Sequence, residues 1–236
     1  ALLVAFIVTE LRHPQPLVRL GILRSPSLVH ANIAGAVMFG SYAAFQFLVT
    51  LFLQDTLGWS PLAMALAFLP AGLLVVLSSV HIDRLLDLVR PVVLIGVGLT
   101  AIFHVYLLFI RGALDLSYAA VLLPTMLLVG AGFAISFPSV NAQATAGVVD
   151  DEQGLAGGLV NTSIQVGGAI MMAVVTAVLA SRAGATGSAS TTAVTGLHAG
   201  LQVIVGLTLV GVLASAWMLF RGQRFPRVEA VLPEVD

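Results

Sequence analysis

The chain has 236 residues, of which 59 % are hydrophobic and 9 % are charged, and its mean hydropathy is +1.06. A water-soluble domain of this composition would expose large apolar patches, so the composition excludes a soluble globular protein and indicates that lipid is the solvent. The net charge of -1 argues against nucleic-acid binding, and the absence of cysteine excludes disulfide scaffolds, thiolate metal sites and cysteine nucleophiles.

Apolar runs long enough to cross a bilayer recur along the chain. A hydrocarbon core of about 30 Å requires about 20 helical residues. The predicted spans are 28–54, 62–80, 91–110, 116–140, 155–180 and 197–220. These runs are longer than the strands of a membrane β-barrel, which alternate apolar and polar residues. The sequence therefore predicts an all-α membrane protein with a six-helix transmembrane bundle over residues 28–220.

The segments outside the bundle differ from it in composition. Residues 1–8 are apolar but too short to span, so we expect the end of a preceding helix in a longer parent chain. Residues 11–28 combine three prolines and three arginines with aliphatic residues, which is typical of an interfacial connector or a plain linker. The predicted division is thus a helix end plus cytoplasmic connector at 1–27, the bundle at 28–220 and a cytoplasmic tail at 221–236.

Arginines are distributed unevenly between the two sides of the predicted bundle. One side carries Arg12, Arg19, Arg24, Arg84, Arg90, Arg221, Arg224 and Arg227. The other side carries only Arg111 and Arg182. Because basic residues concentrate on the cytoplasmic side of membrane proteins, both ends of the chain are predicted to be cytoplasmic.

Several connecting segments carry helix-start signals. Ser60 followed by Pro61 predicts an N-cap and first residue for the second span. The acidic run 150–152 is expected just before the fifth span, where it opposes the positive end of the helix dipole. The Ser-, Gly- and Thr-rich segment 181–196 is predicted to be a flexible external connection.

The first span carries a polar and aromatic stripe at helical spacing. Its members are Asn32, Gly35, Phe39, Tyr42, Gln46 and Thr50. Steps of three and four residues place them on one face of the helix. Within lipid, such a face either packs against a neighbouring helix or lines a cavity that binds bulky, partly apolar solutes.

Two other spans contain unusual residues. In the fifth span, Gly154, Gly158 and Thr162 follow a small-xxx-small spacing that predicts close helix packing, with Asn161 and Gln165 able to bond across or line a cavity. The fourth span contains prolines and paired glycines, so a kink or local unwinding is expected.

Ionisable residues inside the predicted spans are rare. His104 is the one expected well inside a span, where a hydrogen bond to a neighbouring helix is predicted. No serine follows a motif that would pair with this histidine, so an intramembrane hydrolase is not expected. No metal site and no cofactor are predicted.

Short motifs along nearly the whole chain resemble the major facilitator superfamily, in particular its fourteen-helix drug/proton antiporter branch. They lie at 16–24, 31–32, 52–54, 57–62, 68–70, 122–124, 130–132, 137–138 and 154–168. The last of these is similar to the pattern G-x-x-x-G-x-x-N-T-x-x-Q-x-G-G. The segment 83–90 resembles the gating loop of the family.

The resemblance implies that the chain is the C-terminal bundle of a secondary transporter, built as a 3+3 inverted repeat and lacking its N-terminal helical bundle. The implied activity is proton-coupled efflux of drugs or other small lipophilic or cationic compounds from a cell, through the plasma membrane. A non-transporting structural or regulatory membrane subunit is the alternative. The implied substrate cavity contains Asn32, Phe39, Tyr42, Gln46, Ser136, Asn161 and Gln165. The implied gating loop contains Asp83, Arg84 and Asp87.

Overall fold

The computed structural model describes residues 20–112, 118–183 and 189–221, and within these ranges the secondary structure is helical. The elements in order are η1 (Leu20–Arg24), α2 (Pro26–Leu51), η2 (Phe52–Thr56), α3 (Pro61–Ser79), α4 (Ile82–Leu88), α5 (Pro91–Gly112), η3 (Tyr118–Leu122), α6 (Leu123–Thr145), α7 (Asp150–Ala183) and α8 (Ala189–Phe220). The predictions for the preceding helix, most of the connector and the tail lie outside the described residues.

Six helical stretches in the described ranges are long and apolar enough to cross a membrane, which confirms the predicted spans. Two boundaries were predicted wrongly. The acidic run forms the first turn of α7 instead of preceding it, because α7 already begins at Asp150. The external connection expected at 181–196 is mostly helical, since α7 extends to Ala183 and α8 begins at Ala189. The expected gating loop contains the short helix α4.

Serine caps begin the first two spans. Ser60 Oγ accepts a hydrogen bond from the main-chain N–H of Ala63 at 3.2 Å, as predicted, and Pro61 is the first helical residue. Ser25 and Pro26 form the same arrangement at the start of α2, so this helix begins earlier than the hydropathy pattern indicates. Gly58 has a φ of +68°, which lets the chain turn between η2 and α3.

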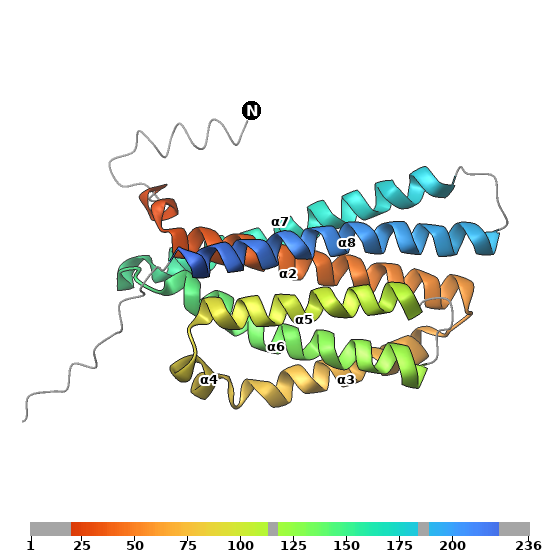
Figure 1. The fold of residues 1–236 in the computed structure, drawn as a ribbon, viewed down its shortest axis with the longest axis horizontal. Coiled ribbons are helices and arrows are strands. Elements are labelled where there is room, and N and C mark those ends of the chain that lie inside the picture. The colour runs from red at the N-terminus through yellow and green to blue at the C-terminus, as the bar shows by residue number, and fades with distance from the viewer. Residues whose placement is uncertain (1–19, 113–117, 184–188, 222–236) are drawn as a thin grey trace, which may run out of the picture.

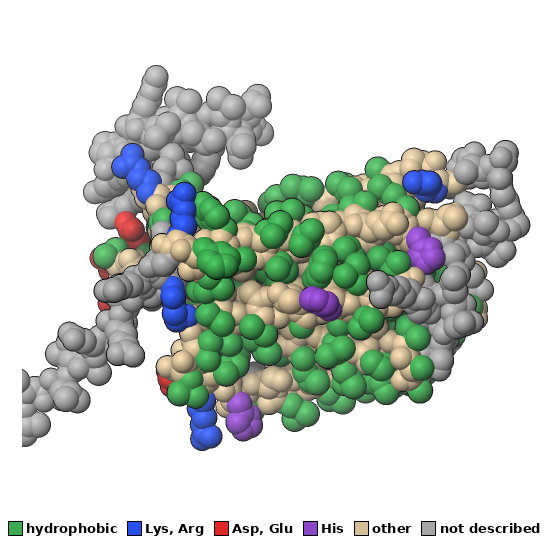
Figure 2. Space-filling view, viewed as in Figure 1, with side chains coloured by type: hydrophobic (Ala, Val, Ile, Leu, Met, Phe, Trp, Pro, Cys, Tyr) green, Lys and Arg blue, Asp and Glu red, His purple; other side chains and the backbone are tan. Residues whose placement is uncertain are grey.

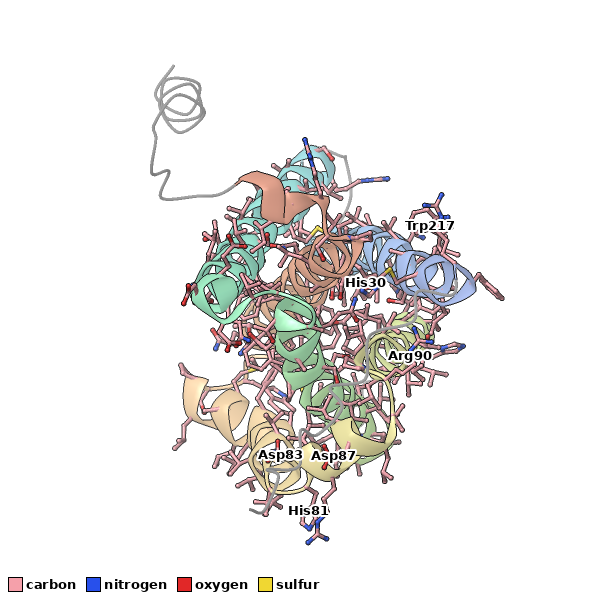
Figure 3. All side chains as sticks on the ribbon, turned by 90° about the vertical axis from the view of Figure 1, so that its left-hand side faces the viewer. His30, His81, Asp83, Asp87, Arg90 and Trp217 are labelled. Atoms are coloured by element: carbon pink, nitrogen blue, oxygen red, sulfur yellow. The ribbon has the colours of Figure 1, made fainter. Side chains whose placement is uncertain are left out.

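The packing of the six long helices follows an inverted repeat. Helix α2 packs against α7 and α8, and α6 packs correspondingly against α3 and α5. The first helix of each triple therefore contacts the second and third helices of the other triple, as a two-fold relation between α2–α3–α5 and α6–α7–α8 requires. Figure 3 shows α2 and α6 in the middle of the bundle, with the remaining long helices around them. The architecture matches the predicted half of a major facilitator fold.

Helices α2 and α7 approach each other closely at Gly167. A Cβ on this residue would lie 2.6 Å from the main-chain oxygen of Ala36, so only glycine permits the contact. The predicted packing through Gly154 and Gly158 is wrong within this bundle, because a Cβ on either residue would meet nothing within 4 Å. The small-xxx-small spacing thus correctly predicts that this helix packs closely against a neighbour, but the contact occurs at Gly167 and not at Gly154 or Gly158.

Apolar side chains fill the interior and also cover the exterior. Phe45 packs against Tyr106 and Phe109 in the centre, with ring centroids 4.8 Å and 5.3 Å apart. Leucine and valine side chains on α3 are largely exposed, among them Leu62 at 70 % and Leu77 at 70 %. Figure 2 shows hydrophobic side chains over most of the visible face. This exterior suits a lipid environment.

Basic side chains gather at one end of the bundle (Figure 2). Helices α2 and α5 begin at this end, and α8 finishes there (Figure 1). We call it the basic end. Its arginines are Arg24 before α2, Arg84 on α4, Arg90 before α5 and Arg221 after α8. Arg182 lies near the last residue of α7, at the opposite end.

Candidate substrate face

The polar stripe of α2 forms an accessible face between α6 and α7. Asn32, Phe39 and Tyr42 are half-buried, and Gln46 is exposed. Asn32 is fixed from two sides: its amide nitrogen donates to the main-chain oxygen of Leu28 at 2.8 Å, and its amide oxygen accepts from Ser163 of α7 at 2.6 Å. An amide held in this way presents a defined polar group at the edge of the face.

Aromatic rings continue this face onto α6. The ring of Tyr42 lies 5.4 Å from that of Phe133, and Phe133 stacks on Phe137 at 5.7 Å with an interplanar angle of 11°. Phe137 is 41 % exposed. Neither phenylalanine was predicted as a site residue, although their spacing of four residues in the fourth span places them on one helix face. The row of rings suits flat, apolar or cationic solutes.

Helix α7 supplies the other flank of the face. Asn161 and Gln165 are exposed and share a helix face with Gly168. A Cβ on Gly168 would lie 3.3 Å from the ring of Phe39, so this side of α7 borders the α2 stripe. The structure thus brings together the predicted residues of the first and fifth spans. We name the set Asn32, Phe39, Tyr42, Gln46, Phe133, Phe137, Asn161 and Gln165 the substrate face.

Ser136 does not belong to the substrate face. It is fully buried, and its Oγ lies so close to Gly98 of α5 that a Cβ there would collide with it. The structure does not bring Ser136 to the other predicted cavity residues, because Ser136 lies on the side of α6 that packs against α5, whereas Phe133 and Phe137 lie on another side. Ser136 instead belongs to the contact between α5 and α6.

The predicted gating residues lie on α4 at the basic end. Asp83, Arg84 and Asp87 are all exposed, and the spacing of four residues puts the two aspartates on one face of this helix. Figure 3 shows Asp83 and Asp87 together on the side of the bundle away from His30. The segment is therefore an exposed helical link between α3 and α5.

The predicted hydrogen bond from His104 to a neighbouring helix is wrong, and a different histidine, His30, is buried between helices. His104 is exposed, and its Nδ1 lies 2.8 Å from the main-chain oxygen of Thr100 on its own helix. His30 is only 5 % exposed and contacts Gln143 of α6 and Ser215 of α8. The sequence analysis did not select His30, because the first span was predicted to begin only at residue 28. The Ser25-Pro26 start signal would have placed His30 one turn inside the helix.

An apolar groove of about 450 Å³ lies elsewhere, between α2, α7 and α8. Aliphatic side chains line it together with Gly167 and Gly206, and it contains no residue of the substrate face. Specific recognition of a polar solute needs a few convergent polar groups, which this lining does not provide. The substrate face is therefore the better candidate for the functional site.

The sequence model of the Major Facilitator Superfamily matches residues 5–172. The chain belongs to this superfamily. The family is one of transporters, so the prediction that the chain is not an enzyme is confirmed, and the six-helix bundle fits one half of a major facilitator fold.

Two curated relatives are drug-resistance proteins. The chain is 36 % identical to the Puromycin resistance protein pur8 of Streptomyces alboniger over 184 residues, which are 75 % of the chain and 36 % of the relative. It is 28 % identical to the Lincomycin resistance protein of Streptomyces lincolnensis over 170 residues, or 72 % of the chain and 35 % of the relative. The chain thus spans about a third of the length of these relatives.

Proposed function

We propose that this bundle is the C-terminal half of a fourteen-helix transporter that exports drugs or other small lipophilic or cationic compounds in exchange for protons. The substrate face would line one side of a central cavity, and an N-terminal bundle of the same parent chain would line the other. Export would proceed by alternating access, as the two bundles rock about the bound solute.

The observation that carries this proposal is the exposure of polar side chains within the membrane-spanning helices. Gln46, Asn161 and Gln165 are exposed at positions where lipid would leave their amides without hydrogen-bond partners. A water-filled cavity, closed by a second bundle, removes this cost. The adjoining rings of Tyr42 and Phe133 supply the apolar surface that a lipophilic or cationic solute requires.

Family and charge distribution support the remaining parts of the proposal. The two relatives named above are resistance proteins, which agrees with export of toxic compounds. The basic end would face the cytoplasm, in accordance with the positive-inside rule. Asp83, Arg84 and Asp87 on α4 would then form a cytoplasmic gating element between the bundles.

The test is efflux of a fluorescent lipophilic cation from cells that express the full-length parent chain, measured with and without a proton uncoupler. Export that the uncoupler abolishes is the expected result. Export that persists without a proton gradient would contradict proton exchange. Correct membrane insertion without export of any dye would favour a non-transporting structural or regulatory subunit.

A further inference from the structure

A buried polar cluster joins three helices at the basic end, away from the substrate face. It consists of Ser27 and His30 on α2, Gln143 on α6 and Ser215 on α8, which are between 0 % and 6 % exposed. Ser27 Oγ donates to the main-chain oxygen of Gln143 at 2.9 Å. Gln143 Nε2 lies 2.6 Å from His30 Nδ1, and His30 Nε2 lies 3.0 Å from Ser215 Oγ. Figure 3 shows His30 between the ends of α2 and α8.

With its amide oriented as in this structure, Gln143 calls for a neutral imidazole at His30. An amide nitrogen only donates, so His30 Nδ1 accepts and the imidazole is neutral, with its proton on Nε2. Nε2 then donates to Ser215 Oγ, whose own hydrogen goes to the main-chain oxygen of Gly211 at 2.9 Å. The remaining amide atom, Gln143 Oε1, is buried without a partner.

We propose that His30 is a proton-binding site, and that binding a proton there opposes the packing of α2 against α6 at the basic end. A protonated imidazole donates from both nitrogens, so Gln143 Nε2 cannot remain beside Nδ1. The amide must rotate by half a turn, which brings the free Oε1 to the ring. This rotation withdraws Nε2 from the main-chain oxygen of Ser27, which it contacts at 3.3 Å.

Among the residues that the structure describes, no carboxylate is hydrogen-bonded to the His30 ring. In the described part of the chain, the imidazole is hydrogen-bonded only to the uncharged side chains of Gln143 and Ser215. The charged residues on the described elements around α2, α6 and α8 at this end are Arg24, Asp83, Arg84, Asp87, Arg90, Asp150, Asp151, Glu152 and Arg221. Of these, all but Glu152 are exposed. A buried and uncompensated charge is costly, so the proton is bound more tightly when α2 and α6 separate and water reaches the ring.

Linkage gives the direction of the effect. A ligand shifts a conformational equilibrium toward the state that binds it more tightly. Acidification should therefore favour an arrangement in which the basic ends of α2 and α6 are apart, and a rise in pH should favour the packed arrangement seen here. This inference rests on the proposed transport function, to which it adds a proton site within this bundle.

The experiment measures the distance between spin labels in the full-length parent chain in lipid nanodiscs, without substrate. Labels are attached after Val29→Cys on α2 and Asn141→Cys on α6, since both side chains are exposed near the cluster. From about pH 8 to about pH 5.5, the ratio of long to short distances should rise, by at most about tenfold per pH unit for one proton. His30→Gln should abolish this response. His104→Gln, the matched control on the exterior of α5, should keep it.

A pH response that persists in His30→Gln, or its absence from the parent chain, would overturn the proposal. If His30→Gln does not fold, Gln143→Glu provides the test, because a carboxylate beside the ring supplies the missing charge. Short distances should then persist to low pH, and lengthening as in the parent chain would contradict the proton site. A His30-dependent response without dye export would overturn only the transport function, and export without this response would overturn only the proton site.

Discussion

At the scale of single residues, the contact between α2 and α7 depends on two missing side chains. Gly167 faces the backbone of Ala36, and a Cβ on Gly40 of α2 would in turn lie 2.8 Å from the main-chain oxygen of Gly167. Close backbone approach of this kind replaces the hydrophobic driving force that helices lack in lipid. Gly167 is consequently intolerant even of a methyl group.

We expect Gly167→Ala to lower the thermal stability of the folded protein, because the new methyl group overlaps the backbone of α2. Overpacking of this kind costs about 1–3 kcal/mol. The measurement is the melting temperature of the purified protein in detergent. Gly206→Ala on α8 is the matched control, since a Cβ there meets nothing within 4 Å. Equal melting temperatures for both variants would show that the α2–α7 contact is looser than described.

A second residue-scale prediction concerns the substrate face. Tyr42→Ala removes a ring that contacts Phe133, and Gln46→Ala removes an exposed amide. Loss of one cation–π contact costs about 0.5–2 kcal/mol, so export of aromatic cations should fall by roughly two- to thirtyfold with little change in folding. Resistance profiles of cells that express each variant measure the effect. Leu209→Ala on α8 should leave them unchanged, and unchanged profiles for Tyr42→Ala would count against this face.

At the scale of helices, local start signals decide where the spans begin. The Ser-Pro pairs at 25–26 and 60–61 begin α2 and α3, and each serine accepts a hydrogen bond from an N–H of the first turn. Ser60→Ala should therefore destabilise the protein by about 1 kcal/mol, detectable as a lower melting temperature. Ser60→Asp keeps an oxygen acceptor at the cap and should retain stability. A loss of equal size in both variants would exclude capping as the cause.

At the scale of the whole molecule, the orientation in the membrane can be tested in a parent chain from which any cysteine outside these 236 residues is removed, since the 236 residues contain none. Single substitutions at opposite ends, Asp87→Cys on α4 and Arg182→Cys on α7, place one thiol on each side of the bundle. A membrane-impermeant maleimide added to intact cells should label Arg182→Cys. It should label Asp87→Cys only after permeabilisation, and the reverse pattern would invert the proposed topology.

Much of the fold was predictable because a bilayer restricts the possibilities. Each span needs about 20 apolar residues with internally satisfied backbone groups, so length and hydropathy locate the six spans found in the described ranges. The ends of the helices were less predictable. Helix α7 begins at Asp150, before its apolar run, because helical hydrogen bonds continue beyond the hydrophobic region and acidic residues stabilise the first turn.

The composition and spacing of the sequence by themselves determined the membrane environment, the number of spans and the stripe on α2, since each depends on local periodicity or length. Only the tertiary structure decided which neighbours those residues meet. It placed Ser136 in the contact with Gly98, turned His104 outward and brought His30 to Gln143, 113 residues further along the chain. The physical reason is that a helix face acquires its environment from the rotation and crossing of its partners, which are set by close contacts between residues distant in sequence.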